Sequence, residues 1–388
     1  MRSAVPVDEP DWWYGPESSA KVRYLRLLEL LYARQAVRRL NRPHQPYRSR
    51  LPVICVGNFT AGGTGKTPLT LHLVDRLTTM GERPVILTRG YGGQLKGPHW
   101  VDATGDWARD VGDEPLLLAR SAPTLISRDR RAGAIAIEAS PMDFSVIIMD
   151  DGLQNPAITK DLTLAIIDAR RGLGNGHVIP AGPLRAPLDA QLPLTDAIVL
   201  NGPPVSPPPE LPIGGDVDAN AGENAGATPS RGADISGTDD VTSARLATLR
   251  REFPGPVLAA HAEAVGDLSW LSAQPIVAFA GIANPDRFFS LVERCGGRIA
   301  ERLTFKDHHS FSEDGARRLL GIAAAAGATL VTTEKDHVRL RGPSEVVGEL
   351  AQAARTLPIR LVIEEADRQR ADALLAGALT PDRLKPYR

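Results

Sequence analysis

Residues 53–68 read VICVGNFTAGGTGKTP and constrain the fold more than any other part of the chain. Residues 53–56 are an apolar run typical of a buried strand, a glycine-rich loop follows, and Lys66 and Thr67 lead into a helix predicted over 68–80. In such a loop successive backbone N–H groups can point at phosphate oxygens, and the N-terminus of the helix adds partial positive charge. The segment therefore predicts a phosphate-binding loop within an α/β fold.

The residues expected to bind phosphate form one continuous run, which is Thr60, Ala61, Gly62, Gly63, Thr64, Gly65, Lys66 and Thr67. The amine of Lys66 would reach the β- and γ-phosphates of a nucleotide, and the hydroxyl of Thr67 would hold Mg²⁺. The general pattern has a glycine five positions before Gly65, where this chain has Thr60. An ordinary glycine-rich turn is the alternative, but a Gly-Lys-Thr sequence at a helix start favours phosphate binding.

Length, charge and cysteine content exclude several classes of protein. The chain has 388 residues, enough for two domains, and its net charge of −1 gives no overall attraction to nucleic acid. Its two cysteines lie far apart in sequence, which argues against a disulfide framework or a metal site and indicates a reducing compartment. The chain lacks a run of 18 apolar residues, and its N-terminus lacks the apolar segment of a secretory signal.

Alternating strand and helix patterns predict a mainly parallel α/β sheet with helices on both faces, followed by a second, smaller α/β unit. Further strands of the first unit are expected at 84–88, 124–127, 146–149, 162–167 and 197–200, and strands of the second unit at 276–280, 329–332 and 359–363. Residues 202–243 are rich in Pro, Gly, Ala, Asp and Ser and predict a flexible insertion. The expected parts are an N-terminal segment 1–45, a core domain 46–201, this insertion, and a smaller domain 244–388.

Residues 21–41 predict an amphipathic helix. Between residues 20 and 50 the chain has nine Lys or Arg and one acid, Glu29. The apolar stripe of the helix consists of Tyr24, Leu25, Leu28, Leu31, Tyr32 and Ala36. Such a helix suits an anionic membrane surface. A helix packed on the domain, with its arginines in water, is an equally open alternative.

An apolar strand predicted at 146–149 is followed by two acids, Asp150 and Asp151. Phosphate-loop enzymes use an aspartate at such a strand end to hold Mg²⁺. Because adjacent side chains on a strand point to opposite faces, we expect one principal metal contact. Asp150 is the favoured residue, and Asp151 is expected to support it.

Three polar segments after the phosphate loop are candidates for acid–base chemistry. In Gly-Asp-Glu-Pro, Asp113 could cap a helix or accept a proton from a substrate hydroxyl. In Lys-Asp-His-His, His308 could supply an acid–base partner from a loop between a strand and a helix. The segment 332–336, Thr-Thr-Glu-Lys-Asp, ends a predicted strand and is either a solvated loop or part of the same site.

Arginines at Arg89, Arg128 and Arg185 each stand beside glycine, proline or a strand end. Guanidinium groups at the carboxyl edge of a sheet can bind phosphate oxygens through paired hydrogen bonds. Any one of them could form a surface ion pair instead. Three near one edge favour a polyanionic substrate.

Ten segments together resemble the tetraacyldisaccharide 4′-kinase family of lipid A synthesis. They are GNFTAGGTGKTP, TRGYGG, VGDEP, SRDR, MDDGLQN, IDARRGLGNG, PAGPLRAP, FAGIANPDRF, DHHSFS and TTEKD. The resemblance runs from about Trp13 to Asp336, without the insertion, and includes Thr60 in the loop. Two features depart from it, namely Asn155, where the family often has His, and the length of the insertion.

The resemblance implies ATP-dependent phosphorylation of the 4′-hydroxyl of a tetraacyldisaccharide 1-phosphate, which forms lipid IVA. The cofactors would be ATP and Mg²⁺, and the partner a glycolipid at the cytoplasmic face of the bacterial inner membrane, with no nucleic acid. This favours the membrane interpretation of helix 21–41. Asp113 resembles the catalytic carboxylate, His308 its partner in a proton-accepting dyad, and Asp150 the acid associated with Mg²⁺.

Two other functions remain open on the sequence. One is a phosphotransferase or ligase that acts on a soluble metabolite and does not need residues 1–45. The other is a nucleotide-switched protein that docks on a membrane and has no phosphoryl acceptor. The segments around Asp113 and His308 count against a switch, because a switch needs no second proton-handling site.

Overall fold

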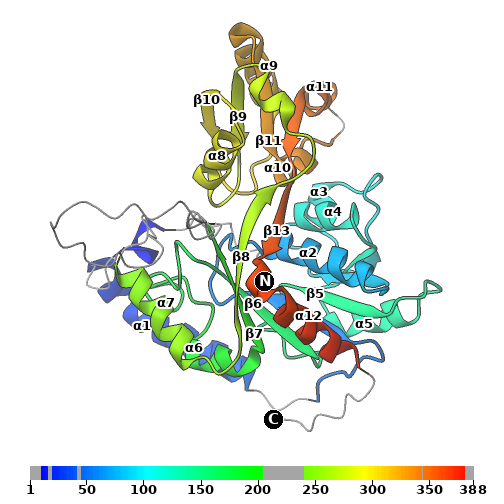
Figure 1. The fold of residues 1–388 in the computed structure, drawn as a ribbon, viewed down its shortest axis with the longest axis vertical. Coiled ribbons are helices and arrows are strands. Elements are labelled where there is room, and N and C mark those ends of the chain that lie inside the picture. Colours follow the sequence, from blue (N-terminus) through cyan, green and yellow to red (C-terminus); the bar gives the residue numbers. More distant parts are fainter. Residues whose placement is uncertain (1–9, 16–19, 42–44, 204–239, 343, 381–388) are drawn as a thin grey trace, which may run out of the picture.

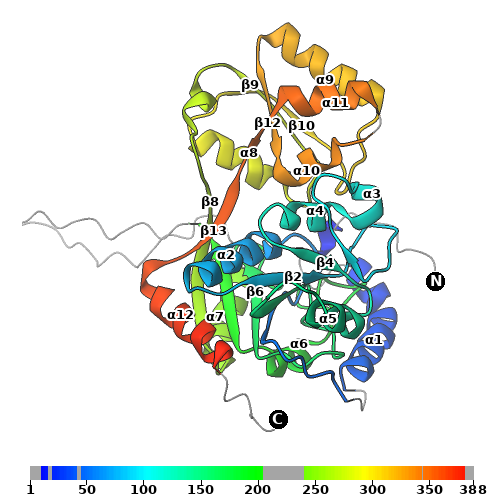
Figure 2. The same cartoon turned by 90° about the vertical axis from the view of Figure 1, so that its right-hand side faces the viewer.

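The computed structural model describes residues 10–15, 20–41, 45–203, 240–342 and 344–380. They form two lobes stacked along the long axis of the molecule (Figures 1 and 2). The large lobe is built on a nine-stranded sheet and the small lobe on a four-stranded sheet. The strands β8 (Val257–Ala264) and β13 (Ile359–Ile363) join the two lobes (Figure 1).

The large sheet has the strand order β13-β8-β7-β6-β1-β5-β2-β4-β3. Its strands besides β8 and β13 are β1 (Val53–Gly57), β2 (Pro84–Thr88), β3 (His99–Trp100), β4 (Thr124–Ile126), β5 (Val146–Asp150), β6 (Leu162–Asp168) and β7 (Ala197–Gly202). All neighbours are parallel except the pairs β13–β8 and β3–β4. β1 lies between β5 and β6, so the loop that follows it opens at the carboxyl edge in the middle of the sheet, where ligands bind in such folds.

Helices cover both faces of the large sheet, as predicted. The apolar cluster on one face joins the strands to α2 (Lys66–Thr79) and α12 (Glu365–Leu379), while α5 (Arg130–Glu138) and α7 (Asp240–Glu252) pack on the other face. Leu69 and Leu77 of α2 are fully buried, which stabilises the fold by roughly 1.5–3 kcal/mol for each side chain. This packing fixes the direction of the helix that begins at Lys66.

The small lobe is a parallel sheet with the order β10-β9-β11-β12. Its strands are β9 (Ile276–Ala280), β10 (Ile299–Thr304), β11 (Thr329–Thr333) and β12 (Ala354–Leu357), and its helices are α8 (Pro285–Arg294), α9 (Glu313–Ala326), α10 (Glu334–Arg339) and α11 (Glu345–Ala353). The hydroxyl of Thr333 accepts a hydrogen bond from the backbone N–H of Asp336 and caps α10. Segment 332–336 is therefore a strand end and a capped helix start.

The expected boundary at residue 244 does not separate the two sheets. β8 and β13 follow that boundary, yet both belong to the large sheet. Leu361 and Ile363 of β13 pack in the same apolar cluster as α2, and β13 pairs antiparallel with β8. The chain therefore leaves the large lobe along β8 and returns to it along β13, a pairing over about a hundred residues that local patterns do not encode.

The predicted N-terminal helix is α1 (Ala20–Leu40), which lies along the outer side of the large lobe (Figure 2). Its buried residues are Val22 and Glu29, whereas Tyr24 is 85% exposed. The other exposed large apolar side chains of α1 are Leu27, Leu28, Leu30, Leu31 and Tyr32. Among the described helices, none is long and apolar enough to cross a membrane. Residues 204–239, most of the predicted insertion, lie outside the described residues.

Candidate active site

The loop between β1 and α2 is held in one shape by contacts from three sides. The backbone N–H of Ala61 donates to the carbonyl of Pro183 at 2.8 Å. The side-chain amides of Asn58 and Asn201 donate to the hydroxyl and the carbonyl of Thr64, each at 3.1 Å. Gly65 has a φ of 104°, and a Cβ there would lie 2.6 Å from the amide nitrogen of Asn201, so this position requires glycine. The protein's own contacts thus hold the loop in one shape.

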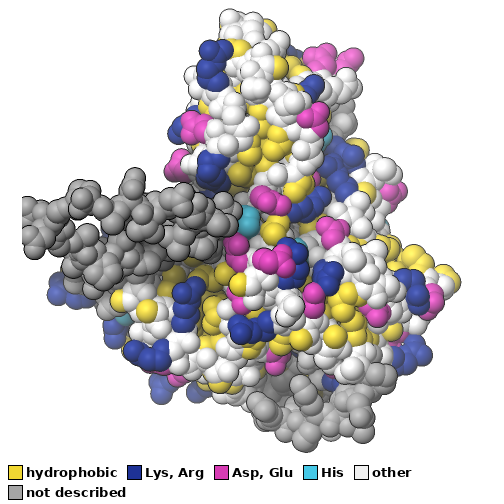
Figure 3. All heavy atoms as spheres, viewed as in Figure 1, with side chains coloured by type: hydrophobic (Ala, Val, Ile, Leu, Met, Phe, Trp, Pro, Cys, Tyr) yellow, Lys and Arg dark blue, Asp and Glu magenta, His cyan; other side chains and the backbone are white. Residues whose placement is uncertain are grey.

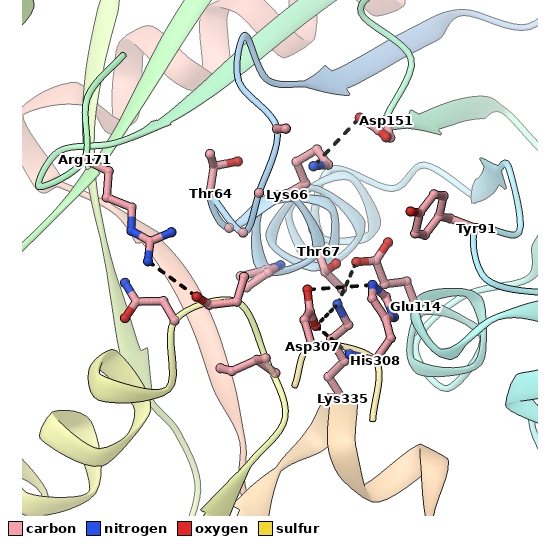
Figure 4. A pocket seen from close by; sticks show the side chains of 18 of the residues that line it. Thr64, Lys66, Thr67, Tyr91, Glu114, Asp151, Arg171, Asp307, His308 and Lys335 are labelled. Carbon is pink, nitrogen blue, oxygen red and sulfur yellow. Dashed lines mark hydrogen bonds and ion pairs between the residues drawn. The ribbon is translucent and has the colours of Figure 1, made fainter. Parts of the chain in front are cut away.

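This loop forms one wall of a cavity of about 1380 Å³ between the two lobes. Residues of the large lobe, of α1 and of the small lobe all line the cavity. In Figure 4, Lys66 and Asp151 lie on one side, while Asp307, His308 and Lys335 approach from the small lobe. Figure 3 shows acidic and basic side chains next to one another where the lobes meet. The cavity therefore combines a phosphate-binding loop with charged groups that face it.

Asp151 is the strand-end acid that reaches the cavity. Its side chain is 33% exposed, and its carboxylate lies 3.8 Å from the amine of Lys66. Nη1 of Arg185 donates to both of its oxygens, at 2.9 and 3.1 Å. Burial alone would raise the pKa of Asp151, but Arg185 and Lys66 lower it overall, so the carboxylate stays ionised at neutral pH.

Asp150 faces the interior of the large lobe instead. It is 1% exposed and accepts hydrogen bonds from the hydroxyls of Thr70 and Thr88, at 3.1 and 3.2 Å. Burial, with Glu114 and Asp151 nearby, raises its pKa to about 6. The geometry therefore favours Asp151 over Asp150 as a ligand for a cation in the cavity, the reverse of the order expected from the sequence.

Asp113 and His308 come from different lobes and meet beside the cavity, which His308 lines. Asp113 is the first residue of α4 (Asp113–Ala119) in the large lobe, and it is 4% exposed. Nδ1 of His308 lies 3.0 Å from Oδ2 of Asp113, and the ring of Tyr91 lies 5.6 Å from the His308 ring. The structure thus brings together the two residues for which the sequence suggested acid–base roles.

Backbone strain also marks this site. Asp151, with a φ of 52°, and His308, with a φ of 58°, are the two residues other than glycine that have a positive φ in the described part of the chain. Such conformations are unfavourable for most side chains and persist where the surrounding structure holds them. Both residues line the same cavity, on opposite lobes. This coincidence supports a functional role for each of them.

Lys335 connects the acids of both lobes. Its amine lies 3.3 Å from Glu114 of the large lobe and 3.6 Å from Asp307 of the small lobe (Figure 4). Burial alone would lower the pKa of Lys335, but the carboxylates of Glu114, Asp113 and Asp307 raise it overall. A permanent positive charge therefore lies beside the Asp113–His308 pair, within the Thr-Thr-Glu-Lys-Asp segment whose role the sequence left open.

The three candidate arginines all line the cavity, but their present contacts differ. Nη2 of Arg128 donates to the carbonyl of Gly93 at 3.1 Å. Arg185 contacts Asp151, and its Nε donates to the carbonyl of Thr60 at 3.0 Å. Arg185 thus ties the phosphate loop to the strand-end acid.

The sequence did not single out Arg339, Asn201 or Arg287. Arg339 contacts Asp113 from the small lobe, and Arg287 of α8 donates to Asn201 at 2.6 Å and to Asp168 at 3.0 Å. Asp168 and Asn201 end neighbouring parallel strands, which was the available signal for placing them at the ligand edge of the sheet. No comparable local pattern identifies Arg339.

Oxygen donors in the cavity fit a hard divalent cation. Thr67 and Asp151 offer a hydroxyl and a carboxylate next to the phosphate loop. Within the described residues, no group of three or more His, Cys, Asp or Glu side chains gathers to hold a metal. A cation here would complete its ligands with phosphate oxygens and water, as Mg²⁺ does in nucleotide sites.

The chain is similar to known proteins over most of its length. A family model described as tetraacyldisaccharide-1-P 4′-kinase matches residues 22–379. The tetraacyldisaccharide 4′-kinase of Methylobacterium sp. (strain 4-46) is 42% identical over 376 residues, covering 96% of this chain and 99% of the relative. That of Nitrobacter hamburgensis is 41% identical over 374 residues, covering 96% and 98%.

The fold is also similar to a solved structure. It matches a crystal structure of an "apo" form of LpxK from Aquifex aeolicus in complex with ATP, with a TM-score of 0.64 and 22% identity, covering 92% of this chain and 99% of that one. This confirms the predicted fold class, a mainly parallel α/β kinase fold with a second, smaller sheet. Family model, relatives and fold agree, and the chain belongs to the tetraacyldisaccharide-1-phosphate 4′-kinase family, the kinases of lipid A biosynthesis.

Proposed function

We propose that this kinase carries out its reaction in the cavity between the lobes, with the phosphates of ATP at residues 60–67 and the sugar 4′-hydroxyl beside His308. One observation carries the proposal: the phosphate loop of the large lobe and His308 of the small lobe line the same cavity, and His308 contacts the buried Asp113 behind it. The similar kinase from Aquifex aeolicus was crystallised with ATP, which supports ATP as the phosphoryl donor here. Backbone N–H groups of the loop and the amine of Lys66 would hold its phosphates.

Mg²⁺ is the second cofactor that we propose, held by Thr67 and by Asp151 rather than Asp150. When bound, the ion would neutralise charge on the β- and γ-phosphate oxygens. Asp151 suits this role because its carboxylate is ionised and lies 3.8 Å from the lysine of the phosphate loop. Asp150, fixed by two threonine hydroxyls, would support the strand end from inside the lobe.

The proton of the acceptor would leave through the Asp113–His308 pair. The 4′-oxygen forms a bond to the γ-phosphorus while the bond from that phosphorus to the β–γ bridging oxygen breaks, and ADP departs with the electron pair. The hydroxyl proton passes to the imidazole of His308, which Asp113 orients through Nδ1. Arg89, Arg128 and Arg185 line the cavity and would bind phosphate oxygens of the donor or the acceptor.

The acceptor is a lipid, and α1 has the surface to meet one. Its exposed leucines and tyrosines suit the apolar layer of a membrane, while its arginines suit anionic head groups. Tyr32, Ala36 and Arg39 of the same helix line the cavity. We therefore place the enzyme at the cytoplasmic face of the bacterial inner membrane, with α1 lying on the surface and the sugar head group entering beside it.

A transfer assay tests this proposal. Wild type and Asp113→Ala are given ATP labelled at the γ-phosphate and the disaccharide 1-phosphate lipid in detergent micelles, and labelled lipid is measured. We expect label in the lipid with wild type and a loss of about 10²-fold or more with the variant. Equal transfer by both enzymes would remove Asp113 from the reaction. Slow ATP hydrolysis that ignores the lipid would instead favour a nucleotide-switched protein.

A further inference from the structure

Arg339 occupies a buried position behind the Asp113–His308 pair. It is the last residue of α10 in the small lobe, and its side chain is 5% exposed. Its Nε donates to Oδ2 of Asp113 at 2.7 Å, and its Nη2 contacts the same oxygen. Its Nη1 donates to the carbonyl of Gly281 and to Oδ1 of Asp336, both at 2.7 Å. All three nitrogens of the guanidinium thus have acceptors, from both lobes.

The small lobe holds this guanidinium in place through Asp336. That carboxylate is fully buried, and its Oδ2 accepts hydrogen bonds from the hydroxyl of Thr333 at 2.6 Å and from the backbone N–H of Gly281 at 3.0 Å. Its other oxygen accepts from Arg339. Because every partner of Asp336 belongs to the small lobe, Arg339 is oriented before it meets Asp113. The planar guanidinium then presents a fixed donor edge to the large lobe.

Asp113 has no open side for a substrate. Oδ2 accepts from Arg339 and faces Nδ1 of His308, while Oδ1 accepts from the backbone N–H of Glu114 at 2.9 Å. The carboxylate is therefore better placed to orient a neighbour than to take a proton directly from a sugar hydroxyl. The neighbour with access to the cavity is His308, whose side chain is 21% exposed.

We propose that Arg339 is a positioning residue for phosphoryl transfer: it locks the Asp113 carboxylate onto Nδ1 of His308, so that Nε2 of the imidazole is presented to the 4′-hydroxyl. The inference rests on the proposed function. It adds Arg339 as a third member to the pair in which His308 receives the proton and Asp113 orients it. A hydrogen bond on Nδ1 selects the tautomer in which Nε2 is the acceptor.

The charges around Asp113 agree with this arrangement. The groups that face it are His308, Arg339 and Lys335, with Glu114 beside it on α4. Asp307 lies next to Lys335, and its carboxylate is also 3.8 Å from Nε2 of His308 and 3.8 Å from Nη2 of Arg339. Burial alone would raise the pKa of Asp113, but Lys335, His308 and Arg339 lower it overall. Loss of the Arg339 charge favours the protonated form of the Asp113–His308 pair. The acidic limb of the rate profile should therefore move to higher pH.

The test compares Arg339→Gln, Arg339→Lys and the control Arg341→Gln across a pH series of the lipid transfer assay. Arg341 is an exposed arginine two residues away that also reaches the large lobe, through the carbonyl of Ala103. For Arg339→Gln we expect kcat to fall about 10- to 100-fold, KM for ATP to change less than about twofold, and the acidic limb to move up by about one pH unit. Lysine keeps the positive charge but cannot form the paired hydrogen bonds of a guanidinium. In Arg339→Lys the acidic limb of the pH–rate profile should therefore return to its wild-type position, while kcat should recover only in part.

Several outcomes would overturn the inference. An unshifted acidic limb in Arg339→Gln, or a loss that Arg341→Gln shares, would reduce Arg339 to a structural contact. If the thermal melt shows that Arg339→Gln does not fold, Arg339→Lys is the test. A wild-type kcat in Arg339→Lys, with the acidic limb of the pH–rate profile unchanged, would contradict a need for the paired guanidinium. A proposed function that is itself wrong gives a different pattern, since Asp113→Ala would then remain active or wild type would fail to label the lipid.

Discussion

Oδ2 of Asp113 lies 3.0 Å from Nδ1 of His308, although α4 of the large lobe carries one residue and a loop of the small lobe carries the other. The contact between Asp113 and His308 therefore depends on how the two lobes are arranged. Any movement that separates the lobes breaks it. In the proposed mechanism, proton transfer from the acceptor therefore requires the lobes to be in contact at this pair.

Asp113→Asn tests the role of the carboxylate with little change in shape. An amide can still contact His308, but it no longer carries the charge that stabilises a protonated imidazole. We expect kcat to fall roughly 10²- to 10⁴-fold with KM for ATP nearly unchanged, measured by steady-state kinetics of labelled transfer. Asp110→Asn, an acid three residues earlier that does not line the cavity, is the control. A kcat of Asp113→Asn within a few-fold of wild type would contradict the assignment.

Lys66→Ala removes the positive charge that we propose binds the phosphates of ATP. The variant also removes one of the two cationic side chains that lie within 4 Å of the Asp151 carboxylate, Lys66 and Arg185. We expect KM for ATP to rise about tenfold or more and kcat to fall about 10²-fold, from ATP titrations at saturating lipid. Lys96→Ala changes an exposed lysine outside the cavity and should behave as wild type. Normal ATP use by Lys66→Ala would contradict the phosphate-loop assignment.

The buried carboxyl of Asp150 predicts a dependence of stability on pH. Its folded pKa is raised to about 6, whereas an unfolded aspartate titrates near ~3.9. Between those values the folded protein binds more protons than the unfolded chain, so this group makes stability fall as pH rises through the interval. Asparagine cannot ionise. The free energy of unfolding of Asp150→Asn should therefore exceed that of wild type by roughly 1–2 kcal/mol at pH 7.5, and this difference should shrink toward pH 4.5.

Thermal melts of both proteins with EDTA, at half-unit steps of pH, measure this difference. EDTA removes any bound cation, so that the melts report the carboxyl alone. The hydroxyls of Thr70 and Thr88 can rotate to meet the amide, which keeps the substitution compatible with the site. A gap between the two proteins that stays constant from pH 4.5 to 7.5 would mean that Asp150 does not titrate in this range.

The parts of the fold that depend on neighbouring residues in the chain could be predicted from the sequence. The residues from Val53 to Thr67 specify strand, loop and helix by their own spacing, and the structure places them so. Which of Asp150 and Asp151 is the better placed metal ligand could not be predicted in the same way. Strand alternation predicts that the two side chains point to opposite faces. Which one faces the cavity depends on the left-handed conformation of Asp151 and on the hydroxyls of Thr70 and Thr88, which donate hydrogen bonds to Asp150 inside the lobe.

Long-range contacts explain what the sequence left out. The sequence predicted β13 as a strand of the second unit and did not predict β8. Both join the first sheet, because their pairing is decided by apolar partners on α2 and α12. Arg339 stands at the end of a helix, where an arginine is ordinary, and its role depends on Asp113, which lies 226 residues away. The pairing of Asp113 with His308 came from family resemblance, since nothing in either segment alone requires the other.

The exposed apolar side chains of α1 predict membrane binding that can be separated from folding. Leu27, Leu28 and Leu31 are 69%, 53% and 59% exposed, so replacing all three with serine should leave the thermal melt nearly unchanged. Binding to vesicles with anionic lipid, measured by flotation, should weaken about tenfold or more. A matched triple variant at Ile135, Met142 and Leu194, which are exposed elsewhere on the large lobe, should bind as wild type. Equal binding by both variants would move the docking surface away from α1.

Arg287 predicts a link between ATP binding and the small lobe. Its guanidinium donates to Asn201, which in turn donates to the carbonyl of Thr64 in the phosphate loop, and to the buried Asp168. Arg287→Met removes both contacts, so the loop loses a support that comes from the other lobe. We expect the Kd for ATP, measured by titration calorimetry, to rise about 5- to 10-fold, while Arg298→Met, at an exposed site of the small lobe, leaves it unchanged. An unchanged Kd in Arg287→Met would show that the phosphate loop keeps its shape without the small lobe.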